Sequence, residues 1–331
     1  MLATPLRLPS CEIEEYRASQ IFSSLVQSDS THIAPIFDEL KVLKERIGVF
    51  KLRRGAHEWK QRQDRFEQHN VGEQSKRGIN RGYDKLMEIL ETSVIEQCTT
   101  CLHLCEAPGG FAQATLTKLN PTTSYAMSMR TNIGFHTLIK NSRCQILDLP
   151  NGCDILMPDI SQAIGTLCPN TTFDFITADG AGNNDVDHSN VELNSVVLLA
   201  KQVSIAMAYQ RKGGTLIVKI FGMAFPVTSR IVYVICASYD HVSVIKPHTS
   251  RASNDERYLI CKGFSNDHSK ELDVEGSLLK FASALRKPND TWMSMYRDVA
   301  SHFAHDQTHA ILAMLNEQNN GKKRKIDRQQ R

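Results

Sequence analysis

Between residues 102 and 264 the chain alternates short apolar runs with turn residues and helical stretches. The apolar runs are LHLCEA, SYAMSM, CQILDL, FDFITAD, GGTLIVKIF, VSVIKP and RYLICKGF. Two longer segments between the later runs, residues 191–211 and 226–239, have helical length and periodicity. Strands that alternate with helices indicate a doubly wound, largely parallel α/β sheet. Because such sheets bind ligands at the carboxyl ends of their strands, we expect a site around EAPGGF, ADGAG and KIFGMAF.

Helical segments flank this alternation on both sides. Residues 12–70 read as helical, with an apolar stripe at i, i+3 and i+4 spacing, and residues 83–97 show a second apolar face. The C-terminal region reads as two or three helices divided at Pro288, and the composition after Gln318 predicts disorder. The expected divisions are a helical extension over 1–80, an α/β domain over 81–265, packed helices over 266–318 and a basic tail over 319–331.

The composition favours an intracellular protein. The chain has 331 residues, is 41% hydrophobic and contains enough apolar surface for a full core. We find no run of 18 apolar residues and no secretory signal pattern, and the nine cysteines lack framework spacing. These features predict reduced thiols and no association with membranes, in the nucleus or the cytoplasm.

Basic residues gather in three clusters, although the net charge is only +3. The clusters cover residues 51–65, 75–85 and 321–331. In the first, Trp59 has a ring that could stack on a base or a cap, although an anchor for the N-terminal helices explains it equally well. Its basic neighbours could contact RNA phosphates: Arg53, Arg54 and Lys60. In the tail, KKRK at 322–325 favours a nuclear localisation signal or a contact with the RNA backbone.

The loop EAPGGF follows an apolar run directly. Gly109 and Gly110 at a strand-to-helix turn expose backbone N–H groups and allow a ligand to approach closely. A purely structural turn explains two glycines as well. The loop lacks the G-x-G-x-x-G spacing of dinucleotide folds and the G-K-[ST] end of a phosphate loop, which counts against hydride transfer and nucleotide hydrolysis.

Charged residues accompany three of the later apolar runs. Asp179 ends FDFITAD, Lys219 lies inside GGTLIVKIF, and Glu256 precedes the last run at the mouth of the sheet. Burial should lower the pKa of Lys219 and make its neutral amine accessible near pH 7. A lysine that snorkels or pairs with a neighbouring acid fits the same pattern.

Four segments of the chain, taken in their order and spacing, resemble the FtsJ-type RNA ribose 2′-O-methyltransferases. The segments are LCEAPGGF, ADGAG, GGTLIVKIF and KPHTSRASNDERYLICKGF. HLCEAPGGF is most similar to the Adrift-like branch, which includes mRNA cap methyltransferases of eukaryotes and of some large DNA viruses. The family signature is a Lys-Asp-Lys-Glu tetrad. The resemblance places the tetrad at Lys85 (in RGYDKLMEI), Asp179, Lys219 and Glu256.

The resemblance implies a Rossmann-like methyltransferase that uses S-adenosylmethionine and acts on RNA, with capped mRNA as the substrate, in a cellular or a viral setting. Such a displacement needs in-line positioning and a base but no metal. We expect Lys219 to be the base, with Lys85 disfavouring its charged form and the two carboxylates orienting the amines.

The resemblance also places the methionine end of the cofactor against the glycine loop. Asp154 is the candidate for the adenosine end, although a turn residue before a helix explains it nearly as well. Glu106 is a candidate for a polar contact that the family makes from a different position. The expected cofactor contacts are Glu106, Pro108, Gly109, Gly110, Phe111, Asp154 and Asp179.

The segment CTTCLHLC superficially suggests zinc, because it contains Cys98, Cys101, His103 and Cys105. No second C-x-x-C pair follows, and residues 102–105 alternate between the faces of a strand. We therefore expect buried, reduced cysteines rather than a metal site.

Two other functions stay open at this point. One is a ribosomal or transfer RNA 2′-O-methyltransferase, which the long N-terminal helical extension and the Adrift-like wording disfavour. The other is a non-catalytic RNA-binding subunit with the same fold, which the intact tetrad disfavours.

Overall fold

The computed structural model describes residues 5–8, 32–71, 78–95, 98–169, 171–181, 191–272 and 284–317. Its strands are β1 (Leu6–Arg7), β2 (Thr100–Leu104), β3 (Thr123–Ala126), β4 (Cys144–Ile146), β5 (Phe173–Ala178), β6 (Gln210–Phe221), β7 (Tyr239–Ile245) and β8 (Glu256–Phe264). They form one eight-stranded sheet in the order β1-β7-β8-β6-β5-β2-β3-β4. Each apolar run of the alternation contains one of these strands, so the predicted α/β fold is confirmed.

The sheet is parallel over β4, β3, β2, β5 and β6, and antiparallel beyond β6. β8 lies between β6 and β7 and runs antiparallel to both. β1 extends the far edge by pairing antiparallel with β7. The prediction of a helical extension over 1–80 is therefore wrong at Leu6 and Arg7, because the open edge of β7 supplies backbone partners for an extended segment.

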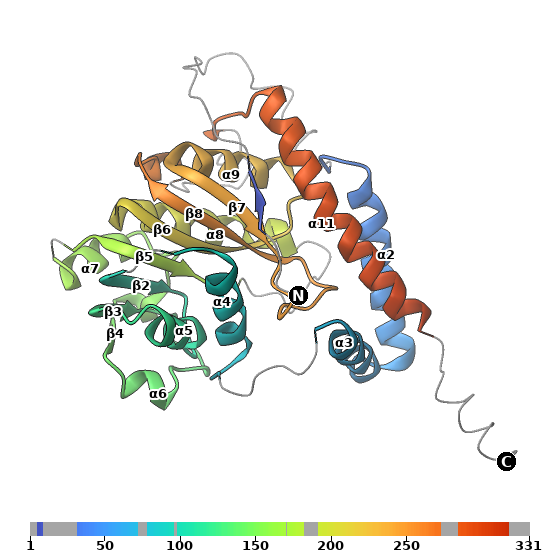
Figure 1. Ribbon diagram of the computed structural model, residues 1–331, viewed down its shortest axis with the longest axis horizontal. Coiled ribbons are helices and arrows are strands. Elements are labelled where there is room, and N and C mark those ends of the chain that lie inside the picture. Colours follow the sequence, from blue (N-terminus) through green and yellow to red (C-terminus); the bar gives the residue numbers. More distant parts are fainter. Residues whose placement is uncertain are drawn as a thin grey trace, which may run out of the picture.

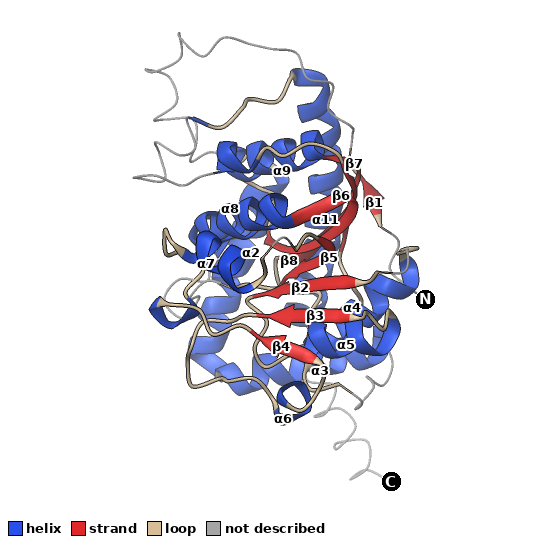
Figure 2. Cartoon of the chain, turned by 90° about the vertical axis from the view of Figure 1, so that its left-hand side faces the viewer, coloured by secondary structure: helices blue, strands red, loops and turns tan. Residues whose placement is uncertain are grey.

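Helices cover both faces of the sheet. They are α2 (Ile36–Arg54), α3 (Ala56–Val71), α4 (Arg81–Thr92), α5 (Gly110–Lys118), α6 (Thr137–Lys140), α7 (Ile160–Leu167), α8 (Val191–Tyr209), α9 (Pro226–Ser238) and α11 (Asp290–Asn316), with short 3₁₀ turns η1 (Asn151–Cys153) and η2 (Ser269–Leu272). α4 and α5 lie on one face, and α7, α8 and α9 lie on the other (Figure 2). α8 is long and apolar enough to span a membrane, but half of that stretch is buried inside the protein.

α2 and α11 run side by side next to this layered domain (Figure 1). The apolar stripe of α2 is buried in the main core cluster, together with the apolar side of α11. The helix continues past Gly48 and ends at Arg54, directly before Gly55, where φ is +89°. The extension helices therefore share one core with the sheet. The predicted basic tail and residues 273–283 lie outside the described residues.

Candidate active site

The tetrad residues meet at the carboxyl edge of the parallel strands. β5 ends just before Asp179, and β6 carries Lys219 opposite Tyr258 of β8. The same ladder places Phe221 opposite Glu256. Because side chains alternate along a strand, Glu256 and Tyr258 share one face of β8, the face that α4 covers.

Lys219 and Asp179 form one half of the cluster. The Lys219 Nζ lies 3.0 Å from Asp179 Oδ1 and donates a 2.7 Å hydrogen bond to the backbone carbonyl of Asp179. The hydroxyl of Tyr258 donates to the same Oδ1 at 2.9 Å. The Lys219 side chain is only 6% exposed, whereas that of Asp179 is 22% exposed. The carboxylate is thus fixed from inside the protein and open on its outer side.

Lys85 and Glu256 form the other half. The Lys85 Nζ lies 2.6 Å from Glu256 Oε1, and the Ser250 hydroxyl donates to that oxygen at 2.8 Å. Lys85 projects from the first half of α4, whose N-terminus is capped by the side chain of Asn80 through a 2.9 Å bond from the Gly82 N–H. The cap and the strand register therefore set the separation of this ion pair.

The charges of neighbouring side chains, rather than burial, set the direction of the pKa shifts of Lys219 and Glu256. Burial alone would lower the pKa of Lys219, but Asp179 and Glu256 outweigh it and raise the pKa above its ordinary value. The prediction of a lowered Lys219 pKa is therefore wrong for the protein alone. Burial alone would raise the pKa of Glu256, but Lys85 and Lys219 lower it to about 2. Lys219 acts on both carboxylates, so the two ion pairs form one electrostatic unit.

The glycine loop is shaped by the protein itself. Gly109 has a φ of +117° at the N-cap of α5, and a Cβ there would collide with Ile139. A Cβ on Gly110 would collide with the Asn80 side chain and lie 2.7 Å from the backbone nitrogen of Tyr83. The close approach that the glycines permit is therefore, in this structure, the approach of α4 and of the segment around α6.

The other predicted cofactor residues occupy mixed positions. Glu106 is buried, accepts a 2.8 Å hydrogen bond from the Ala112 N–H, and has its pKa raised well above the ordinary value by burial. Phe111 is 1% exposed and its ring packs near that of Tyr258, and its contact with the cofactor stays a prediction. Pro108 is half-buried and its carbonyl accepts from the His136 N–H.

Asp154 is a turn residue, which is the structural alternative that the sequence left open. Its Oδ1 accepts a 3.0 Å hydrogen bond from the Leu156 N–H, which is a turn contact. Its charge also helps to raise the pKa of Cys105, which follows β2 at the carboxyl edge. Asp154 therefore lies near the edge where a cofactor would bind, and its contact with a cofactor stays a prediction.

The cysteine-rich segment forms no metal cluster in the described part of the chain. The Cys98 and Cys101 sulfurs are 3.4 Å apart and both side chains are buried. The His103 Nδ1 instead lies 2.8 Å from the Thr177 hydroxyl, deep in the sheet. Burial lowers the pKa of His103 to about 3, so this imidazole stays neutral.

The predicted RNA contacts divide into one buried ring and three exposed cations. Trp59 is 4% exposed and packs edge-on against Phe50, at 5.7 Å between ring centres. It anchors α3 to α2, and the prediction that it stacks on a base is wrong because the ring does not reach the surface. Arg53, Arg54 and Lys60 are exposed, and their contact with RNA stays a prediction.

Several residues that support the tetrad were not identified from the sequence. Tyr258 could have been found from strand alternation, since it lies two residues after Glu256. Four others hold the loop 246–255 from separate helices, Lys246 holds it from within the loop, and no local pattern marks any of them. These contacts are Glu88 to the N–H groups of His248 and Thr249, Gln63 to Ser253, Gln307 to the Ser253 carbonyl, Lys44 to Asp255, and Lys246 to Asn254 and the Glu256 carbonyl.

A cavity of about 470 Å³ adjoins the tetrad on the other side of β8. It lies between α2, the start of α8 and the turn after β6, and Asp255 and Arg257, which flank Glu256, line it. The rings of His32, Phe37 and Phe225 border the cavity. The centre of the His32 ring lies 4.9 Å from that of Phe225 and 6.2 Å from that of Phe37. This is enough space for a nucleobase beside aromatic surfaces.

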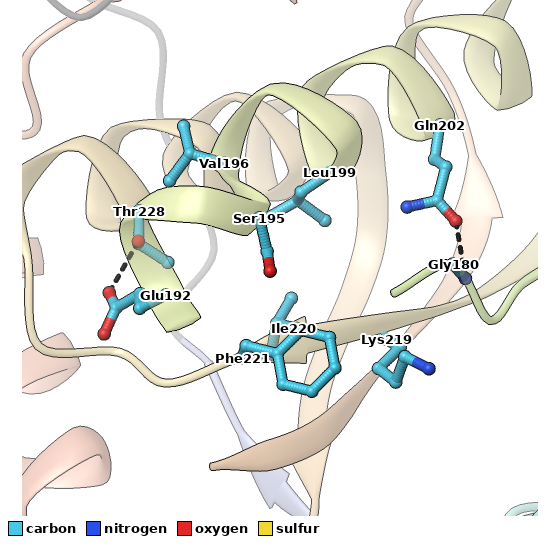
Figure 3. A pocket seen from close by; sticks show the side chains of 10 residues that line it. All are labelled: Gly180, Glu192, Ser195, Val196, Leu199, Gln202, Lys219, Ile220, Phe221 and Thr228. Carbon is cyan, nitrogen blue, oxygen red and sulfur yellow. Dashed lines mark hydrogen bonds between the residues drawn. The ribbon is translucent and has the colours of Figure 1, made fainter. Parts of the chain in front are cut away.

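A smaller cavity lies behind Lys219, between α8 and β6 (Figure 3). At one end, Glu192 accepts hydrogen bonds from the Thr228 hydroxyl and from the N–H groups of Ala224 and Phe225. At the other end, Gln202 accepts from the Gly180 N–H at 2.9 Å. These contacts fix the turns after β6 and β5, and so the positions of Lys219 and Asp179.

Residues 79–264 match the family model described as FtsJ-like methyltransferase. The chain is 30% identical over 212 residues to cap-specific mRNA (nucleoside-2′-O-)-methyltransferase 1 of Trypanosoma cruzi, which covers 56% of each protein. It is 36% identical over 89 residues to the human protein of the same name, covering 27% of this chain and 11% of that one. The matches thus span about half, or much less, of these relatives' length.

Among solved structures, one described as a ribosomal RNA methyltransferase from Plasmodium falciparum aligns with a TM-score of 0.42 and 20% identity, over 56% of this chain and 97% of that one.

Proposed function

The chain belongs to the FtsJ-like methyltransferase family, and we propose that it methylates the ribose 2′-hydroxyl of cap-proximal nucleotides in mRNA with S-adenosylmethionine as the methyl donor. The observation that carries the proposal is the tetrad, in which two ion pairs share one electrostatic unit at the carboxyl edge of the sheet. The relatives named for cap-specific mRNA methylation support the choice of substrate.

The carboxylate of Asp179 suits a cationic methyl donor. Its Oδ1 accepts the bonds from Lys219 and Tyr258, while 22% of the side chain remains exposed at the edge of the sheet. When bound, S-adenosylmethionine supplies a methyl group on a positively charged sulfonium. Asp179 would attract that charge, and the glycine loop at the N-terminus of α5 would lie against the methionine end.

The ribose hydroxyl must lose a proton as it attacks, and Lys219 is the group placed to take it. In the protein alone, the two carboxylates favour the ammonium form of Lys219. A cation bound at Asp179 would offset the charge of one of these carboxylates. The pKa of Lys219 would then fall, and more of its amine would be in the neutral form that can accept a proton. Lys85, tied to Glu256, is placed to hold the ribose or its phosphate on the other side.

The 470 Å³ cavity supports a capped substrate. A 7-methylated guanine carries positive charge and stacks well on aromatic rings. Of the three rings that border the space, that of His32 is half-buried, whereas Phe37 and Phe225 are buried. Lys41, exposed on α2 at the cavity, is placed to meet the linking phosphates.

The test uses S-adenosylmethionine labelled in its methyl group together with capped mRNA fragments, the same fragments without a cap, and ribosomal RNA. We expect label only in the capped RNA, recovered after nuclease digestion in a cap-proximal 2′-O-methylated nucleotide. Label only in uncapped stable RNA would contradict the cap assignment and favour the ribosomal or transfer RNA function. Transfer to no RNA, with RNA binding retained, would favour a non-catalytic subunit.

A further inference from the structure

A carboxylate from the extension helix α3 lies between two guanidinium groups beside the tetrad. Glu67 Oε2 is 3.4 Å from an Arg81 terminal nitrogen, and Glu67 Oε1 is 4.0 Å from the Arg251 Nε. The Glu67 side chain is 10% exposed, whereas those of Arg81 and Arg251 are 35% and 32% exposed. Two partly exposed cations thus share one buried anion.

The carboxylate fits this position poorly. Within the described part of the chain, Glu67 Oε1, Arg81 Nε and Arg251 Nε are buried and have no hydrogen-bond partner. Burial outweighs the two arginines and raises the pKa of Glu67. A good carboxylate–guanidinium pair has donor–acceptor distances near 2.8 Å. The two guanidinium groups therefore hold a space larger than a carboxylate fills.

The space between the two guanidinium groups lies close to Lys85 and Glu256. Arg81 lies one helical turn before Lys85 on α4, and its guanidinium is held by a 2.8 Å bond to the Thr249 carbonyl. Arg251 follows Ser250, whose hydroxyl binds Glu256. Figure 1 shows the loop after β7, which carries Arg251, between α4 and the helices α2, α3 and α11. Both arginines are thus adjacent to the Lys85–Glu256 half of the tetrad.

We propose that Arg81 and Arg251 form a subsite for an RNA phosphodiester next to the methylated ribose, and that Glu67 occupies this subsite until RNA displaces it. This inference rests on the proposed function, because it takes RNA as the ligand. In RNA the 3′-phosphate is attached to the carbon beside the 2′-hydroxyl, so a phosphate one helical turn from Lys85 accompanies a ribose at the tetrad. A tetrahedral phosphate with charge-assisted bonds to two guanidinium groups fills the space that the carboxylate leaves.

The test is Glu67→Gln, which removes the competing charge and keeps the shape of the side chain. Binding of a fluorescent capped RNA oligonucleotide is measured by anisotropy over a range of KCl concentrations. Release of two partly exposed ion pairs should tighten binding by about threefold or more. Each phosphate that the variant neutralises and the wild type does not should steepen the slope of log Kd against log salt by about 0.7, because its condensed counterions are released.

Glu45→Gln is the matched control, because Glu45 is exposed on α2 and its replacement changes the net charge equally. It should bind RNA as the wild type does. Adding Arg251→Gln to Glu67→Gln should cancel the gain, since the freed cation is then absent. A cooperative thermal unfolding transition shows that each variant is folded. Glu67→Asp is a further variant, which keeps the carboxylate and shortens the side chain.

The proposed subsite would be overturned if Glu67→Gln bound RNA no more tightly than Glu45→Gln and its salt slope were unchanged. Glu67 would then be a structural bridge between the two arginines. The binding readout does not require methyl transfer. A tighter Glu67→Gln variant without any transfer to capped RNA would therefore contradict the proposed function but not the subsite. Transfer to capped RNA with unchanged binding would contradict only the subsite.

Discussion

Lys219 combines deep burial with two neighbouring carboxylates, and the two effects oppose each other. The sequence predicted the burial, because GGTLIVKIF is apolar around the lysine. The sequence predicted the wrong sign for the pKa shift of Lys219, because that sign depends on how closely Asp179 and Glu256 approach in space. The same limit applies to Trp59, whose residue type suggested a contact with RNA and whose position is in the core.

The raised pKa of Lys219 predicts how activity depends on pH. A base must be neutral, and below its pKa the neutral fraction of an amine rises about tenfold per pH unit. We therefore expect kcat/KM for S-adenosylmethionine, which reports on the protein without bound cofactor, to rise with a slope near one in log units from about pH 6 to 9, without a plateau in that range. A profile that is flat over this range would contradict Lys219 as the base.

At the scale of elements, the glycine loop serves the packing of α4 on α5. Asn80 caps α4 and lies against Gly110, so one side chain sets both the start of α4 and its distance from α5. Lys85 projects from α4, and the position of the tetrad lysine therefore depends on this contact. The sequence showed that something approaches the glycines closely, but only the three-dimensional structure identifies Asn80.

Gly110→Ala should destabilise the protein because its Cβ collides with Asn80 and with the backbone of Tyr83. Overpacking of this kind costs about 1 to 3 kcal/mol. Urea unfolding measures the change, and methyl transfer should fall as Lys85 moves with α4.

Gly48→Ala is the matched control for this change. Gly48 lies exposed within α2, and a Cβ there would meet nothing within 4 Å. This replacement should stabilise the protein by about 0.5 to 1 kcal/mol, because alanine favours a helix interior over glycine. Equal effects of the two changes would contradict a specific contact at Gly110.

The strands were predictable because a buried parallel sheet requires continuous apolar runs, and each run became a strand. The direction of β8 follows from the loop that returns from β7, and β1 joins through backbone pairing at an edge. Neither depends on a side-chain pattern. The loop before β8 is likewise held by contacts from α2, α3, α4 and α11, which come from distant parts of the chain.

At the scale of the whole molecule, the extension helices support the proposed active site. Lys44 of α2 binds Asp255 at 2.7 Å, and Gln307 of α11 binds both Arg257 and the Ser253 carbonyl. Asp255 and Arg257 flank Glu256, so both ends of the chain help to hold a tetrad residue. The resemblance predicted the four residues of the tetrad, whereas the contacts that hold them could be found only in the folded structure.

The central claim is that the tetrad acts as one unit in methyl transfer to RNA. The most direct test compares the wild type with Lys219→Ala in single-turnover transfer to capped RNA, with binding of labelled S-adenosylmethionine measured in parallel by equilibrium dialysis. Loss of a general base should slow transfer by about 10²- to 10⁴-fold. We predict this loss with cofactor binding retained; a Lys219→Ala variant that still transfers methyl groups at the wild-type rate would contradict the claim.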